Sequence, residues 1–190
     1  KLELAKNYNQ VLSALTEEFQ NTIGYNTAWI YLFEQDGEYM RLLSSGGDND
    51  ITAELPLLKV KGNPTLEEIA EGDHIVVVNN ARTDPRTDKK LVAQIDILTI
   101  INVPVLFENN MLGCVGTGSF GEEGIRPPSH SDLEYLQAVS NHIAVIIDRF
   151  KYVESLKQIN QKMRISEQAL TISEMKFRSG EFEHSNCLTN

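Results

Sequence analysis

The chain has 190 residues, of which 41% are hydrophobic, so it can bury one substantial core but not two. Its 17 lysines and arginines against 27 acidic residues give a net charge of −10, which argues against nucleic acid and anionic membranes as partners. The longest apolar stretch is too short to span a bilayer, and the two cysteines form no paired motif that would indicate a disulfide framework or a zinc site. We expect a cytoplasmic segment of a longer polypeptide, because the chain begins at Lys1 with neither a methionine nor an apolar signal core.

In chain order, the sequence predicts helices before and after an antiparallel sheet. Helices follow from apolar residues at steps of three and four, and strands from short aromatic and β-branched runs beside turn signals such as Asp36-Gly37. The predicted elements are a helix at 2–19, strands at 28–34, 39–45 and 55–60, a helix at 66–71, a strand at 74–78, a helix at 89–96, strands at 99–107 and 111–120, and a helix from 131. We expect Asn63 and Pro64 to supply the N-cap and first-turn proline of the helix at 66–71, and Gly72 to end it. We expect the last strand pair to be central, and a capping box of Ser131 and Glu134 to begin the terminal helix. This is an α+β plan.

The terminal helix is the longest predicted element, because residues 131–177 contain neither proline nor glycine. Its apolar residues recur at alternating steps of three and four, which is the spacing of a coiled-coil dimer seam. The predicted seam residues are Leu136, Val139, Ile143, Ile146, Phe150 and Val153. The apolar series continues beyond Val153 with a phase shift at Leu156. We expect a homodimer through the first and last helices, in which the far part of the rod either switches between two packings or acts as a passive spacer.

Several stretches of sequence resemble one known family over about residues 2–149. They are residues 28–37 (AWIYLFEQDG), residues 84–86 (DPR) and residues 102–115 (NVPVLFENNMLGCV), followed by a proline-rich loop and the helix that starts near 131. By these motifs the chain resembles a GAF domain. The resemblance implies a GAF-like antiparallel sheet flanked by helices, with a ligand pocket between the sheet and the segments from 55 to 98.

The end of the chain resembles a second family less extensively. Residues 173–178 and 182–185 are similar to the opening of a PAS domain, and a disordered polar tail is the alternative. We therefore expect a GAF sensory domain at 1–149, a coiled-coil signalling helix at 150–177, and a linker or the beginning of a truncated PAS domain at 178–190. By resemblance to sensor proteins with this order, a downstream output domain in the same chain would be a histidine kinase or a diguanylate cyclase.

Four motifs that suggest other functions lack the sequence context those functions need. Residues 116–121 have dinucleotide-binding spacing, but acids and prolines follow where a helix should start. Residues 46–48 resemble the start of a cyclase signature, and we expect a turn there. The four histidines share no metal-ligand spacing, and His142 is the least implausible haem ligand. Cys114 lies in a predicted strand, unlike the bilin-attachment cysteine of some GAF domains, and is expected to be a core residue.

The functional prediction is a non-catalytic sensory domain. No nucleophile–base constellation is evident, so we expect no catalytic residue, no metal and no cofactor, with a small molecule of unknown identity as the ligand. The candidate pocket residues are Trp29, Tyr31, Arg41, Asp84, Arg86, Asn102 and Thr117. Turn capping and solvent exposure are the alternative roles of the polar ones. The predicted domain binds a ligand and signals through a dimeric coiled coil; the alternative is a ligand-free dimerisation scaffold.

Overall fold

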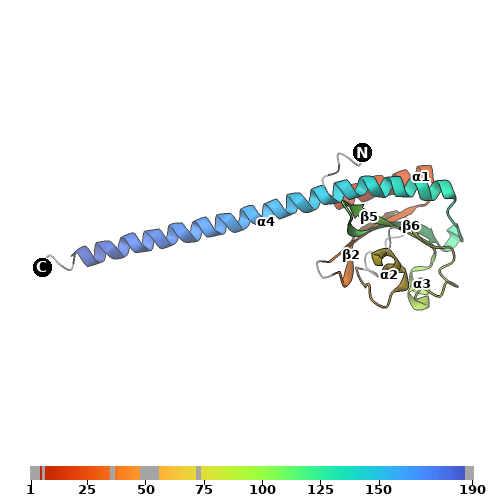
Figure 1. The fold of residues 1–190 in the computed structure, drawn as a ribbon, viewed down its shortest axis with the longest axis horizontal. Helices are drawn as coiled ribbons and strands as arrows, with labels where there is room; N and C mark the ends of the chain where they lie inside the picture. Colours follow the sequence, from red (N-terminus) through yellow and green to blue (C-terminus); the bar gives the residue numbers. More distant parts are fainter. Residues whose placement is uncertain (1–4, 6, 35–36, 48–55, 72–73, 187–190) are drawn as a thin grey trace. The chain divides into compact units, whose positions relative to one another are not determined.

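The computed structural model describes residues 5, 7–34, 37–47, 56–71 and 74–186, with side chains described as far as residue 175 (Figure 1). The chain divides into two compact units, Lys1–Asp148 and Arg149–Asn190. The elements are α1 (Tyr8–Thr22), β1 (Thr27–Phe33), β2 (Tyr39–Gly47), β3 (Leu57–Lys59), α2 (Pro64–Glu71), β4 (Val76–Val78), α3 (Lys89–Ile95), β5 (Ile97–Phe107), β6 (Asn110–Phe120), the 3₁₀ turn η2 (Gly121–Glu123) and α4 (His130–Asn186). Among the described helices, none combines the length and the apolar character that crossing a membrane requires.

The six strands form one antiparallel sheet in the order β3-β2-β1-β6-β5-β4. This confirms the predicted GAF-like α+β plan, with β6 beside β1 in the middle and β5 between β6 and β4. The β5–β6 hairpin closes through Glu108 and Asn109, whose φ angles of 47° and 66° suit a two-residue turn.

Asn63 begins α2 as predicted, since its Oδ1 accepts a hydrogen bond from the backbone N–H of Leu66. The predicted stop at Gly72 lies outside the described residues.

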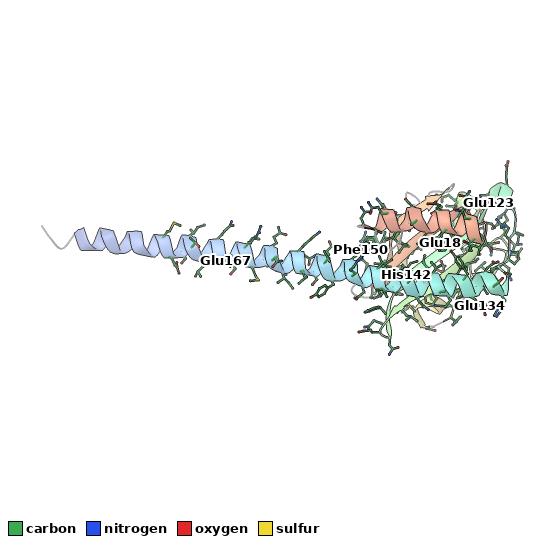
Figure 2. The ribbon with its side chains drawn as sticks, turned by 90° about the horizontal axis from the view of Figure 1, so that it is seen from above. Glu18, Glu123, Glu134, His142, Phe150 and Glu167 are labelled. Carbon is green, nitrogen blue, oxygen red and sulfur yellow. The ribbon has the colours of Figure 1, made fainter. Side chains whose placement is uncertain are left out.

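Helices cover both faces of the sheet in the first unit. α1 and the first part of α4 lie side by side on one face, while α2 and α3 lie on the other (Figures 1 and 2). The rings of Phe19 on α1 and Tyr135 on α4 meet edge to face, with centroids 6.4 Å apart. Alternation along β1 places Trp29 and Tyr31 in the core cluster on the α2 and α3 side, so Ala28 and Ile30 point to the opposite face.

The capping box that begins α4 lies two residues before the predicted one. The capping box consists of Ser129 and Asp132: the backbone N–H of Asp132 donates to Ser129 Oγ at 3.2 Å, and the backbone N–H of Ser129 donates to Asp132 Oδ2 at 2.8 Å. The same Ser-x-x-acid spacing occurs at Ser131 and Glu134, but the helix begins at the earlier pair, directly after Pro128.

The apolar stripe at the start of α4 belongs to the core of a single chain. The single chain, with no second copy present, already buries four of the expected seam residues to between 0% and 8% exposure: Leu136, Val139, Ile143 and Ile146. The later seam candidate Val153 is 43% exposed. Ser140 on the same stretch is also fully buried, and its hydroxyl donates to the carbonyl oxygen of Pro104 in β5 at 2.6 Å. The first four residues of the expected dimer seam therefore pack within their own domain, because a core-facing helix and a coiled coil require the same spacing of apolar residues.

Replacing Ile143 by alanine is expected to lower the free energy of unfolding by about 3 kcal/mol, because the side chain is fully buried within one chain. Urea unfolding measures this loss, and it should be the same at low and high protein concentration. Val145→Ala is the matched control on the same helix: Val145 is 56% exposed, and its replacement should cost less than about 0.5 kcal/mol. A loss for Ile143→Ala that grows with protein concentration would instead place Ile143 in an interface.

Candidate functional site

A cavity of about 100 Å³ lies between the sheet and the segments that cover its second face. Trp29, Tyr31, Asn102 and Cys114 line it from the sheet. Further apolar lining residues come from α2 and α3, namely Leu66, Leu91, Val92 and Ile95, and from β3 and β5, namely Leu58, Ile97 and Ile100. The remaining lining residues are Asn63, Thr65, Arg86, Thr87 and Asp88. The site is therefore mainly apolar, with a few polar groups at defined positions, as small-molecule pockets usually are.

The sheet wall is shaped by the indole of Trp29, which lies across β6 where that strand has no side chains. A Cβ atom added to Gly116 would lie 1.9 Å from Trp29 Nε1, and one added to Gly118 would lie 3.2 Å from Trp29 Cη2. Phe120 meets the indole edge to face, with ring centroids 6.4 Å apart and planes at 88°. Gly116 and Gly118 of the 116–121 motif thus lie in β6, whereas Gly121 begins η2. Gly116 makes room for the indole, and a Cβ atom at Gly118 would lie only 2.1 Å from the carbonyl oxygen of Thr99 in β5.

Asn102 pairs with the indole across the sheet. Its Oδ1 accepts a hydrogen bond of 2.9 Å from Trp29 Nε1, and both side chains are buried. Because the indole nitrogen can only donate, the amide oxygen of Asn102 faces it and the amide nitrogen Nδ2 faces elsewhere. Within the part of the chain that the structure describes, Nδ2 donates no hydrogen bond. Asn102 lines the cavity, so it offers a hydrogen-bond donor there.

Arg86 braces the covering segments. Its Nη1 donates to Glu68 Oε2 on α2 at 2.6 Å, and its Nη2 donates to the carbonyl oxygen of Val77 in β4 at 2.8 Å. Nε and Nη2 also donate to the two carboxylate oxygens of Asp84, at 3.0 and 2.8 Å. The guanidinium thereby ties α2, β4 and the loop that contains the Asp84-Pro85-Arg86 motif into one wall.

The same contacts set the charge state of this wall. Hydrogen bonding to Arg86 is the largest cause that lowers the pKa of Asp84, from 3.8 to about 2. The bonds to Asp84, with a smaller contribution from Glu68, raise the pKa of Arg86 above its usual range. Both groups are therefore charged at every pH between about 4 and 10.

The structure brings four of the expected site residues to the cavity: Trp29, Tyr31, Arg86 and Asn102. Asp84 contacts the cavity only through Arg86. Arg41 does not line this cavity, since it lies on β2 and forms an exposed ion pair with Glu34. Thr117 is buried away from the cavity, where its hydroxyl donates to the carbonyl oxygen of Thr27 at 2.7 Å.

Most of the apolar wall was missed by sequence reasoning. Leu66, Leu91 and Ile95 belong to short amphipathic helices, and the only available signal was the apolar face of each helix. That pattern predicts burial but does not distinguish a packed core from a cavity wall.

Cys114 is fully buried in β6, and burial raises the pKa of its thiol to about 12. The thiol is thus protonated at neutral pH and is a poor nucleophile. Tyr31 is also buried, which raises the pKa of its hydroxyl. Among the described residues, no group of three or more His, Cys, Asp and Glu side chains is placed to hold a metal ion, and His142 lies exposed on α4 (Figure 2).

Comparison with known proteins identifies the fold. The model of the GAF domain family matches residues 5–148. No curated protein matches the chain.

The chain is similar to the GAF domain of a phosphoenolpyruvate-protein phosphotransferase from Coxiella burnetii, with 11% identity and a TM-score of 0.68 over 81% of this chain and 90% of that one. It is also similar to a GAF domain/HD domain protein from Geobacter sulfurreducens, with 14% identity and a TM-score of 0.63 over 77% and 95% of the two chains. A methyl-accepting chemotaxis protein, residues 122 to 287, gives 12% identity and a TM-score of 0.64 over 80% and 95%. At these identities the likeness is one of fold.

The variant Asp84→Asn tests how much the ion pair between Asp84 and Arg86 contributes to the free energy of unfolding. Because the pKa of Asp84 lies below its ordinary value in the folded chain, its ionised form stabilises the fold above about pH 4, and this stability is lost as the pH falls towards about 2. The variant should lower the free energy of unfolding at pH 7 by at most about 2 kcal/mol, and its difference from the wild type should shrink between pH 4 and pH 2. Urea unfolding across this range measures both effects. Glu108→Gln, on the exposed β5–β6 turn, is the matched charge control, and a difference for Asp84→Asn that does not vary with pH would contradict the assignment.

Proposed function

Since the chain belongs to the GAF domain family, whose members are sensory and regulatory domains, we propose that it is a non-catalytic input domain that binds a small molecule and passes the signal along α4 to an output domain. The observation that carries this proposal is the cavity beside Trp29 and Asn102. It is bounded by a fixed aromatic ring, and the donor at Asn102 Nδ2 is available to orient a ligand.

The proposed output route is α4 itself, because this helix runs from His130 to Asn186 and so belongs to both units of the chain. In the second unit its apolar residues are exposed when the chain is alone. Five of them follow steps of four, three, four and seven: Tyr152, Leu156, Ile159, Met163 and Leu170, with exposed fractions of 64%, 41%, 51%, 56% and 63%. Ser166 takes the position within the step of seven, and Val153, Ile165, Ile172 and Met175 lie outside this series. Leu156, Met163 and Leu170 take the a positions of a heptad, and Tyr152 and Ile159 take d positions.

This register has no phase shift within 152–170. The shift at Leu156 arises when the series is continued through Val153, which is 43% exposed and lies outside this register. We therefore propose that α4 uses one stripe to pack on its own domain and a different stripe, beginning at Tyr152, to contact a partner.

Charge supports a second copy of the chain as that partner. In the same register Lys162 takes a g position and Glu167 the following e position. In a parallel, in-register dimer the g residue of one helix lies beside the next e residue of the other, so Lys162 and Glu167 would form two attractive pairs. A dimer of this kind would bring two downstream output domains together; a histidine kinase or a diguanylate cyclase preceded by a PAS domain remains our proposal for that output.

Native mass spectrometry of the protein purified from cells tests the ligand-binding role. We expect a reproducible mass above that of the polypeptide, lost under denaturing conditions. Leu91→Trp should abolish the retained mass, because the larger side chain fills the cavity from α3. Leu57→Trp, at a position that is 42% exposed, is the matched control and should retain it. A dimer that carries no extra mass in any preparation would favour the ligand-free scaffold.

The double variant Leu156→Glu with Met163→Glu is expected to convert the dimer to a monomer, because it places like charges in the proposed helix–helix core. Sedimentation equilibrium measures the change. The control Gln158→Glu with Gln161→Glu adds the same charge to the same helix outside the a and d positions, and should remain dimeric. If both double variants have the same mass as the wild type, the partner-contacting stripe is not the one proposed.

A further inference from the structure

We propose that the ligand of the cavity is a small uncharged molecule built on one ring, with one hydrogen-bond acceptor that receives Asn102 Nδ2. This inference rests on the proposed function, since it names the chemical class of ligand for the same site. It follows from three features of the cavity: the state of its cation, the chemistry of its walls and its size.

The positively charged side chain that lines the cavity, Arg86, already forms hydrogen bonds within the protein. Among the described lining residues, Arg86 is the one that carries a positive charge. Four of its five N–H groups donate to Asp84, Glu68 and the carbonyl of Val77, at 2.6 to 3.0 Å. An anionic ligand would have to displace the carboxylates that already bind Arg86. Binding an anion there is therefore less favourable than binding it to an arginine that has no partners.

The surrounding charge also disfavours an anion without creating a cation site. Three carboxylates, those of Glu68, Asp84 and the lining residue Asp88, lie near the cations of Arg86 and of Lys89, whose Nζ donates to Thr87 Oγ1 at 2.7 Å. These acids are nevertheless occupied: the first two bind Arg86, and Asp88 Oδ1 accepts the backbone N–H groups of Lys90 and Leu91 as the N-cap of α3. A cationic ligand would lie near the guanidinium and would meet an otherwise apolar wall, so its desolvation would be poorly compensated.

The walls and the volume fit one ring. The indole of Trp29 lies over Gly116 and Gly118 on β6, meets Phe120 edge to face, and also lines the cavity, so it offers aromatic surface to a ring bound there. A volume of about 100 Å³ is on the scale of the ~150 Å³ cavity that holds a benzene molecule. The donor at Asn102 Nδ2 lies in the same wall as the indole, so a ring that stacks there can present an acceptor to it.

Three probes of the same shape separate the charge classes: benzamide is neutral, benzoate is an anion and benzamidine is a cation at pH 7.5. Trp29 is the only tryptophan of the chain, so its fluorescence reports binding at this cavity. We expect benzamide to quench or shift this fluorescence with a dissociation constant about tenfold or more below those of the two charged probes.

The variant Asn102→Asp tests the donor. It retains an oxygen for Trp29 Nε1 and replaces the Nδ2 donor by a second oxygen. Benzamide affinity should fall about tenfold or more, because the acceptor of the ligand would then face an acceptor. Asn110→Asp makes the same exchange at an exposed position at the start of β6 and should bind like the wild type. Cooperative unfolding and a retained indole N–H resonance show that the variant is folded; if it is not, the comparison of the three probes on the wild type decides.

Each outcome bears on the inference. Binding of benzoate or benzamidine as tight as that of benzamide overturns the uncharged class while leaving a ligand-binding role in place. No response of Trp29 to any of the three probes overturns the one-ring class. The binding role is judged separately by the mass retained in native mass spectrometry, so failure of this inference is distinguishable from failure of the proposed function.

Discussion

The hydrogen bond between Trp29 and Asn102 is the contact on which the candidate site depends. An indole N–H buried without an acceptor would cost about 1–3 kcal/mol, so the amide oxygen of Asn102 is committed to it. The ring can reach this partner only because β6, the strand between them, has a glycine at position 116. One contact thereby fixes the orientation of the aromatic wall and of the Asn102 amide.

Arg86 has the complementary role on the covering wall. A guanidinium in a pocket usually suggests recognition of an anion. Here its N–H groups already donate hydrogen bonds to Glu68, Asp84 and a carbonyl oxygen of β4. The charge therefore stabilises the protein, and little of it remains for a ligand. Consequently most donors of Arg86 are used within the protein, and the buried Asn102 amide offers a neutral donor at the cavity.

The order of the elements could be predicted because its signals are local. Asp36-Gly37, Asn63-Pro64 and the β5–β6 turn each mark a boundary within a few residues, and strand alternation separates Trp29 from Ile30. The role of Gly116 could not be predicted, because it depends on a tryptophan 87 positions earlier in the chain. The seam on α4 shows a different limit: steps of three and four identify an apolar stripe, but they do not say whether a domain or a partner covers it.

For the proposed signal, β5 offers a direct physical route between the cavity and the first part of α4. Asn102 lies at the cavity, and two residues later the carbonyl of Pro104 accepts the hydroxyl of Ser140 on α4. A ligand that binds Asn102 and shifts β5 along the sheet would alter this buried hydrogen bond directly. Such a ligand changes the population of helix states only by its difference in affinity for them.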